Sequence, residues 1–324
     1  AKHLATRASQ GRLSVFFGAG VSASAGLPTW PELLAQLAIR AGFDEADREG
    51  LRRLGPLDQA ELIARRFGAA ALGPHVRDCL DIGDALGLGH ALLAGLPVSE
   101  FITTNYDDCF ERACAAIGRP VARLPYAPAT QAQRWLLKMH GCVSAPDDIV
   151  LTRQHYVRYA ERNAALAGIV QAMLITRHML FVGFSLDDDN FHRIVDAVRR
   201  ALAGSERERL GTVVSLFPNP LIEQLWGDDL RWLSLASPEA TIHRAARRFE
   251  IFLDYLSFLA ATPSHLLNPR FDAVLSPGEV ELRAILEPVR EWMKRQPRPA
   301  ADDPVATSFA RVYALLADLG SHTH

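Results

Sequence analysis

The segment Leu13–Trp30 joins an apolar run to a glycine-rich turn, and this junction constrains the fold more than any other part of the chain. The five residues before Gly18 are typical of a buried parallel strand, and the residues after Gly20 can open a helix. Gly18 tolerates the backbone angles of a tight turn, and Gly20 has no Cβ to block a phosphate. Residues 18–23 fit the looser G-x-G-x-x-[G/A] form of the dinucleotide-binding fingerprint, in which a helix start presents free N–H groups.

The turn alone leaves two interpretations open, a nucleotide site and plain packing of a strand against a helix. A simple dinucleotide-binding fold carries an acidic residue at the end of a second strand about 20 residues further on, where it bonds the ribose. Here the corresponding segment, Pro31–Arg40, has apolar residues at helical spacing. The usual ribose carboxylate is therefore missing. Other segments have to decide between a nucleotide site and plain packing.

Three later segments repeat one arrangement, a short apolar run that ends in polar residues. They are Ser99–Asp107, Trp135–Gly141 and Met179–Asn190. Because open α/β sheets bind ligands at the carboxyl ends of their strands, these polar residues are candidates for one shared site. Taken singly, Thr104, Asp107 and Asp187–Asp189 could cap helices, and His140 could be an ordinary buried histidine. Their recurrence after three strands favours the shared site.

The alternation of strands and helices predicts an α/β fold. Strands are expected near residues 99–104, 121–124, 135–139, 149–151, 179–183, 212–217 and 231–235, in addition to the run before Gly18. Helical spacing at residues 161–176 and 189–203 separates several of them. This pattern is typical of a Rossmann-like, mainly parallel sheet covered by helices on both faces. We expect this sheet domain to occupy residues 1–240.

Two parts of the chain are predicted to be helical only. Residues 44–96 form a helical insertion placed over the proposed site, with Gly73-Pro74 interrupting its helical pattern. Residues 241–324 form a C-terminal helical extension, in which Ser276-Pro-Gly-Glu279 is a capping box, Pro288 should kink the helix and Asp303-Pro304 should open another. The apolar content of residues 249–259 is typical of ordinary core, with an oligomer interface as the alternative.

Composition indicates a cytoplasmic protein. The formal charge of −2 gives no excess of positive charge, so we expect no direct binding of nucleic acid. No run of 18 apolar residues occurs, and we expect neither a membrane span nor a signal peptide. The four cysteines are scattered, as suits a reducing compartment. They contain no Cys-x-x-Cys pair, so we expect no structural metal site.

Taken together, these motifs resemble the sirtuin superfamily, and more closely its bacterial sirtuin-like NAD hydrolases of antiphage defence systems. The matching residues, in the family's order over residues 10 to 240, are Gly18-Ala-Gly-Val-Ser22, Gly26-Leu-Pro-Thr-Trp30, Thr103-Thr-Asn-Tyr-Asp107, Lys138-Met-His-Gly141 and Gly183-Phe-Ser-Leu186. The resemblance implies that NAD binds with its pyrophosphate at residues 18–22, including Ala19 and Ser22. It implies that the nicotinamide ribose lies near Asn105 and His140, with Thr104 and Asp107 beside it, and the adenosine side near Gly183 and Ser185.

Two departures from protein-deacylating sirtuins bear on the reaction. Those enzymes carry Asp-Phe-Arg where this chain has Thr29-Trp30-Pro31, so their arginine has no counterpart. They also carry a zinc ribbon, which the cysteine spacing here does not provide. Both differences favour hydrolysis of NAD by water over transfer to an acyl-lysine peptide.

The chemistry of that hydrolysis assigns roles to two residues. Cleavage between ribose C1′ and nicotinamide passes through an oxocarbenium-like transition state. The Asn105 amide can position water and ribose hydroxyls, and a neutral His140 can act as the general base. Asp107 either orients the ribose or caps the helix that follows it.

The sequence therefore predicts an NAD glycohydrolase that releases nicotinamide and ADP-ribose, with NAD as substrate and no metal. The resemblance implies that assembly or a defence partner, such as an ATPase, an Argonaute or a second copy, activates it. A protein deacylase and an NAD- or ADP-ribose-sensing subunit without turnover remain as alternatives. The sequence does not separate a linear from a cyclic product, and it does not identify the trigger.

Overall fold

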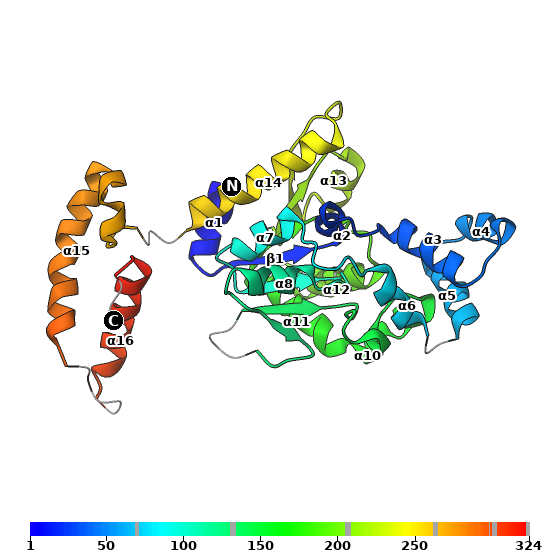
Figure 1. Ribbon diagram of the computed structural model, residues 1–324, viewed down its shortest axis with the longest axis horizontal. Helices are drawn as coiled ribbons and strands as arrows, with labels where there is room; N and C mark the ends of the chain where they lie inside the picture. The colour runs from blue at the N-terminus through cyan, green and yellow to red at the C-terminus, as the bar shows by residue number, and fades with distance from the viewer. Residues whose placement is uncertain are drawn as a thin grey trace. The chain divides into compact units, whose positions relative to one another are not determined.

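The computed structural model describes residues 1–68, 71–129, 134–204, 209–261, 265–297, 299 and 303–321. The chain divides into two compact units, Ala1–Leu259 and Ala260–His324. The first unit contains a seven-stranded sheet, and the second contains helices in its described residues (Figure 1).

The sheet of the first unit is parallel throughout, in the order β3-β4-β2-β1-β5-β6-β7. Its strands are β1 (Leu13–Phe17), β2 (Glu100–Thr103), β3 (Ala122–Leu124), β4 (Trp135–Lys138), β5 (His178–Val182), β6 (Gly211–Ser215) and β7 (Leu230–Ser234). The predicted α/β fold with a mainly parallel sheet is confirmed. Pairing of β1 with both β2 and β5 brings the segment before the glycine turn to the centre of the sheet.

Helices cover both faces of this sheet, which explains why its central strands β1 and β5 are buried at every position. Successive side chains of β1 point to opposite faces. Phe16 meets Phe191 of α12 (Asp189–Ala201) at 5.3 Å between ring centroids, whereas Phe17 meets Phe110 of α8 (Cys109–Ala116) at 5.0 Å. The same two faces are completed by α11 (Ala164–Thr176) beside α12 and by α7 (Leu88–Gly95) beside α8.

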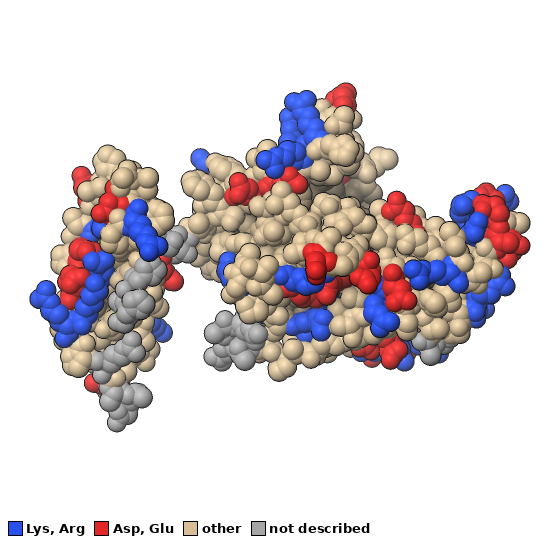
Figure 2. Space-filling view, in the orientation of Figure 1, with Lys and Arg blue, Asp and Glu red and all other residues tan. Residues whose placement is uncertain are grey.

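A second core lies under a group of helices that extends to one side of the sheet in Figure 1. It is built from α3 (Trp30–Arg40), α4 (Glu45–Arg52), α5 (Pro56–Phe67) and α6 (Leu72–Cys79), together with Ile149 and Leu151. The core thus includes α3, while α7, which the sequence placed in the same insertion, packs against α8. Gly73 and Pro74 lie in the first turn of α6. Figure 2 shows basic and acidic side chains interspersed over α4, as in the pair Arg52–Glu49 at 2.8 Å.

One predicted strand is wrong. Residues 149–151 are not paired in the sheet, because their backbone groups bond elsewhere. Val150 N donates to His140 O at 2.9 Å, and Val150 O accepts from Tyr106 Oη at 2.8 Å. Ile149 and Leu151 point into the helical core, and Val150 points into the sheet core. The apolar run that suggested a strand is a segment whose side chains pack alternately into the helical core and the sheet core.

The other helical predictions hold with small changes of boundary. The segment predicted as one helix at 161–176 is broken at Asn163 into α10 and α11. The remaining elements of the first unit are α1 (Lys2–Ser9), α2 (Ala19–Ser22), η1 (Ala23–Ala25), η2 (Pro146–Asp148), α9 (Arg153–Val157), α10 (Tyr159–Arg162), α13 (Pro220–Trp226) and α14 (Ile242–Ala260). By its contacts, α14 belongs almost wholly to the first unit, so the contact boundary falls one helix later than residue 240.

The second unit is organised around Leu267, Met293 and Leu316. It contains η3 (Pro269–Val274), α15 (Pro277–Arg295) and α16 (Ala306–Asp318). The predicted capping box at the start of α15 is confirmed, since the side chains of Ser276 and Glu279 bond each other's backbone N–H. Helix α15 continues through Pro288, and α16 begins at Ala306, slightly after the predicted Asp303-Pro304.

Among the described residues, no helix combines the length and the apolar character needed to cross a lipid bilayer.

Candidate active site at the carboxyl edge of the sheet

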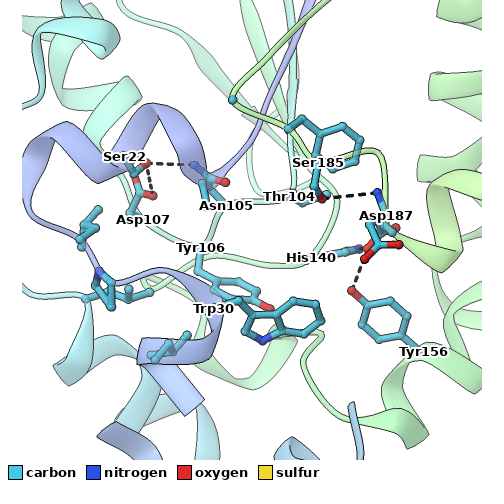
Figure 3. A pocket seen from close by; sticks show the side chains of 18 residues that line it. Ser22, Trp30, Thr104, Asn105, Tyr106, Asp107, His140, Tyr156, Ser185 and Asp187 are labelled. Carbon is cyan, nitrogen blue, oxygen red and sulfur yellow. Dashed lines mark hydrogen bonds and ion pairs between the residues drawn. The ribbon is translucent and has the colours of Figure 1, made fainter. Parts of the chain in front are cut away.

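A cavity of about 240 Å³ lies at the carboxyl ends of β1, β2, β4 and β5 (Figure 3). It is lined by Ala19, Ser22, Leu27, Pro28, Trp30, Leu33, Leu80, Thr104, Asn105, Tyr106, Asp107, His140, Tyr156, Gly183, Phe184, Ser185, Asp187 and Asp188. The structure therefore brings both predicted catalytic residues, Asn105 and His140, to one cavity. Of the predicted cofactor contacts, Ala19, Ser22, Thr104, Asp107, Gly183 and Ser185 line the cavity, whereas Gly18 and Gly20 do not.

The glycines of the first turn are required by a close approach of two loops. A Cβ on Gly18 would lie 2.6 Å from Gly183 O, and a Cβ on Gly20 would lie 2.8 Å from Gly183 Cα. Gly183 itself has a φ of +60°, and Gly20 N donates to its carbonyl oxygen at 2.9 Å. Packing of the β1 turn on the β5 turn therefore accounts for both glycines, and their contact with a pyrophosphate stays a prediction.

The hydroxyl of Ser22 is the centre of a buried hydrogen-bond network. It donates to Asp107 Oδ2 at 2.9 Å, accepts from Asn105 Nδ2 at 3.0 Å and lies 3.1 Å from His90 Nε2. Because a hydroxyl has one proton, which is given to Asp107, the His90 nitrogen must be the donor in the third bond. Burial keeps the pKa of His90 below its ordinary value, which favours a neutral ring protonated at Nε2. Ser22 thus fixes the amide orientation of Asn105.

Asp107, one residue before the N-cap Asp108, forms a side-chain hydrogen bond at the start of α8. Its Oδ1 accepts from Cys109 N at 3.1 Å, and its Oδ2 accepts from Ser22. The structure thus gives Asp107 a bond to the first N–H of α8, although the N-cap position is Asp108, and a contact of Asp107 to ribose stays a prediction.

A buried lysine holds the loop that carries Asn105. Lys138, at the end of β4, donates to the backbone carbonyls of Asn105 and Asp107 and lies 3.3 Å from Glu111 Oε1. Its side chain is 1% exposed. Burial disfavours the ammonium, but Glu111, Cys142 and Asp107 together outweigh burial, and the pKa of Lys138 is raised. The cation therefore stays charged and fixes the backbone on both sides of Tyr106.

We expect Lys138→Met to lower the free energy of unfolding by about 3–5 kcal/mol, because it leaves Glu111 buried without its cation and frees two carbonyls. Urea unfolding measures this change. Lys294→Met is the control, since its partner Glu291 is a surface residue 3.0 Å away and exposed pairs contribute about 0–1 kcal/mol. A loss no larger than that of the control would contradict the role assigned to Lys138.

His140 is buried against Asp188 and two tyrosines. Its Nε2 lies 3.5 Å from Asp188 Oδ2, and its ring is 5.4 Å from that of Tyr156 and 5.7 Å from that of Tyr159. Burial lowers the pKa of His140, and the negative charge of Asp188 opposes this shift only in part. The imidazole is therefore neutral at pH 7, as a general base requires.

Three further ligand-type groups meet beside the cavity. His90, Asp107 and Cys109 are buried and place one potential metal-ligand atom each within 4.8 Å of one another. Burial and the neighbouring Asp107 raise the pKa of Cys109 to about 12, so its thiol is protonated at pH 7. The hydrogen bonds of Ser22 and Cys109 N already engage the other two groups, so this donor set does not fit a metal ion well.

The sequence did not single out Asp188, Tyr156 or His90 as site residues. Asp188 was grouped with its neighbours as a helix start, which it is, since its Oδ1 accepts from Phe191 N at 2.9 Å. Tyr156 and His90 lie on helices outside the motifs. The packing of α9 and α7 brings them to the site. For Asp188, its place among the polar residues that follow β5 was the one sequence signal that could have indicated a site residue.

The first unit thus has a parallel sheet with a glycine turn after its central strand, and Asn105 and His140 line one cavity at the carboxyl edge of that sheet. A protein-family model described as a SIR2-like domain matches residues 99–229 of this chain. The predicted resemblance to the sirtuin superfamily is confirmed. The match contains Asn105, His140 and Ser185 and begins after the glycine turn.

Curated relatives agree with this assignment. The chain is 31% identical over 206 residues to "NAD(+) hydrolase ThsA" of Enterococcus faecium and 29% identical over 205 residues to the protein of the same name from Acinetobacter baumannii. Each alignment covers 61% of this chain and 42% of the relative. It is also 24% identical over 206 residues to "Defense-associated sirtuin 2" of Bacillus subtilis, covering 20% of that protein. The chain thus spans about two fifths of the length of the first two relatives.

Proposed function

We propose that this protein hydrolyses NAD at the bond between nicotinamide and ribose and releases nicotinamide and ADP-ribose. The observation that supports the proposal most is the convergence of Asn105 and a neutral His140 on one cavity at the carboxyl edge of the sheet. The names of the two ThsA relatives describe those proteins as NAD(+) hydrolases.

The reaction needs little more than positioning and one base. As the C1′ bond to nicotinamide breaks, the cationic pyridinium leaves as a neutral amide and the ribose develops oxocarbenium character. Asn105 would hold a water or ribose hydroxyl through Oδ1, while one of the two N–H groups of Nδ2 donates to Ser22 and fixes the amide. His140 would accept a proton from the water that attacks C1′, and that proton is later released to solvent.

The cavity is smaller than the roughly 300–1,000 Å³ typical of drug-sized ligand sites. We therefore place the reacting end of NAD in it, with the adenosine side extending past Gly183 and Ser185. Ala19 and Ser22 would border the pyrophosphate. Chromatography of NAD products tests the proposal, because it separates nicotinamide, linear ADP-ribose and cyclic ADP-ribose. Nicotinamide release without any acyl-lysine peptide supports hydrolysis, and an absolute requirement for such a peptide would indicate a deacylase instead.

We further propose a cytoplasmic role in antiphage defence, and the name of the Bacillus subtilis relative describes that protein as defence-associated. The four cysteines are all free, as suits a reducing compartment. Depletion of NAD harms the host cell, so the activity has to be gated by assembly or by a partner such as an ATPase or an Argonaute.

Self-association has a candidate surface on the outer face of α15. Leu282, Ile285, Val289 and Trp292 recur at the 3-4-3 spacing of a coiled-coil seam and are 42–69% exposed. Antiparallel pairing of two copies of α15 with Leu282 opposite Trp292 would bring Glu281 of one copy to Arg295 of the other. This charge complementarity favours a second copy of the chain as the partner.

We expect Ile285→Arg to shift the protein from dimer to monomer in analytical ultracentrifugation without loss of folding, because Ile285 is 69% exposed. Glu281→Arg should weaken the dimer, and adding Arg295→Glu should restore it, since the swap recreates both ion pairs. A wild-type protein that stays monomeric at micromolar concentration, or a double variant no stronger than Glu281→Arg, would contradict this surface.

A further inference from the structure

The turn between β5 and α12 places the carboxylate of Asp188 next to the buried Nε2 of His140. Gly183 and Leu186 both have left-handed backbone angles, with φ of +60° and +61°. A leucine in this conformation is strained, and its burial in the sheet core offsets the strain. The result is a tight turn that ends at Asp188, the N-cap of α12.

Both oxygens of Asp188 are held in place by protein donors. Oδ1 accepts from Phe191 N at 2.9 Å, and Oδ2 accepts from Tyr156 Oη at 2.8 Å. The Asp188 side chain is 8% exposed. The carboxylate therefore has a fixed position, and Oδ2 is the oxygen that faces His140.

The contact with His140 decides which ring nitrogen carries the proton. Nε2 is buried with no hydrogen-bond partner, and Asp188 Oδ2 at 3.5 Å is the polar atom it faces. If Nε2 carried no proton, its lone pair would face the lone pairs of the Asp188 carboxylate in a buried site, and the two would repel each other. A protonated Nε2 is instead attracted to the carboxylate. Hydrogen bonds between catalytic groups are often long before substrate binds and tighten in the complex, and the 3.5 Å between Nε2 and Oδ2 fits this behaviour.

Resting on the proposed hydrolysis, we infer that Asp188 is a positioning residue that holds His140 in the Nε2-protonated tautomer and leaves the basic lone pair on Nδ1. Tyr156 assists by donating to the same oxygen, which keeps it aimed at the ring. Asp188 then does for this histidine what a buried aspartate does for the histidine of a hydrolytic triad.

Asp188→Asn tests this role, because asparagine keeps the N-cap and removes the charge. Its amide N–H can donate to Nε2, which should turn His140 to the Nδ1-protonated tautomer. We expect kcat for NAD to fall at least about 100-fold, with KM within about threefold of wild type. Asp189→Asn is the matched control, since Asp189 is exposed in the same first turn and does not line the cavity.

The tautomer is read directly from the imidazole ¹⁵N shifts of His140, assigned by comparison with His140→Gln. The inference expects Nε2–H in wild type and in Asp189→Asn, and Nδ1–H in Asp188→Asn. Nδ1–H in wild type, or equal kcat in the two aspartate variants, overturns it. Because the NMR measurement does not depend on turnover, a protein that fails to cleave NAD would refute the proposed hydrolysis and leave the tautomer test intact.

Discussion

Replacing Asn105 with alanine should lower the rate of nicotinamide release from NAD by about 10²–10³-fold, which is the loss seen when one preorganised polar contact to a reacting centre is removed. Ser22 holds Nδ2 of this amide at 3.0 Å, and no described protein group donates to Oδ1. The amide is thus oriented before substrate arrives, and alanine removes both the oriented oxygen and the bond to Ser22.

Single-turnover kinetics with chromatography of the products measures this loss, and isothermal titration with NAD shows whether binding persists. Asn268→Ala, in the second unit and outside the cavity, is the control for a general effect of the substitution. Release at the wild-type rate by Asn105→Ala would refute the role given to this residue.

His140→Gln should lower kcat by about 10²–10⁴-fold, because glutamine keeps a polar side chain of similar reach but cannot accept the proton. The wild-type pH profile adds a second expectation. Burial lowers the pKa of His140, so the neutral base persists below the usual histidine range near pH 6.5. The rate should stay level as pH falls through 6.5 and decline only at the lowered pKa.

The free energy of unfolding should also depend on the protonation of His140. The unfolded chain takes up a proton on this histidine at a higher pH than the folded chain does, so the free energy of unfolding falls as pH drops from 6.5 toward the lowered pKa. His140→Gln should remove this contribution. A kcat profile that declines at or above pH 6.5 would show that the base is a different group.

The sheet and the placement of Asn105 and His140 were predictable, because both follow from local sequence. Apolar runs such as Leu13–Phe17 mark strands buried on two faces, and polar residues just after such strands must meet at one edge. Helix starts with strong capping residues, such as Ser276, were equally clear. These features need no knowledge of long-range packing.

What could not be predicted depends on contacts between distant segments. Residues 149–151 are as apolar as a strand, and only the bonds of Val150 to His140 and Tyr106 show that they lie outside the sheet. Ser22 was assigned to the cofactor, but its hydroxyl is engaged by Asn105, Asp107 and His90, a network spanning more than 80 residues. Its contact with NAD remains a prediction.

The position of Val150 connects His140, the proposed base, to the helices beside the sheet. Ile149 and Leu151 are anchored among α3–α6, while the amide between them holds the carbonyl of His140. Gly141, next to that carbonyl, has no room for a side chain, since a Cβ there would lie 2.5 Å from Asp148 O. We therefore expect a tilt of the helical group to displace the backbone of His140, so that a regulator bound to those helices would change the rate of the proposed hydrolysis without entering the cavity.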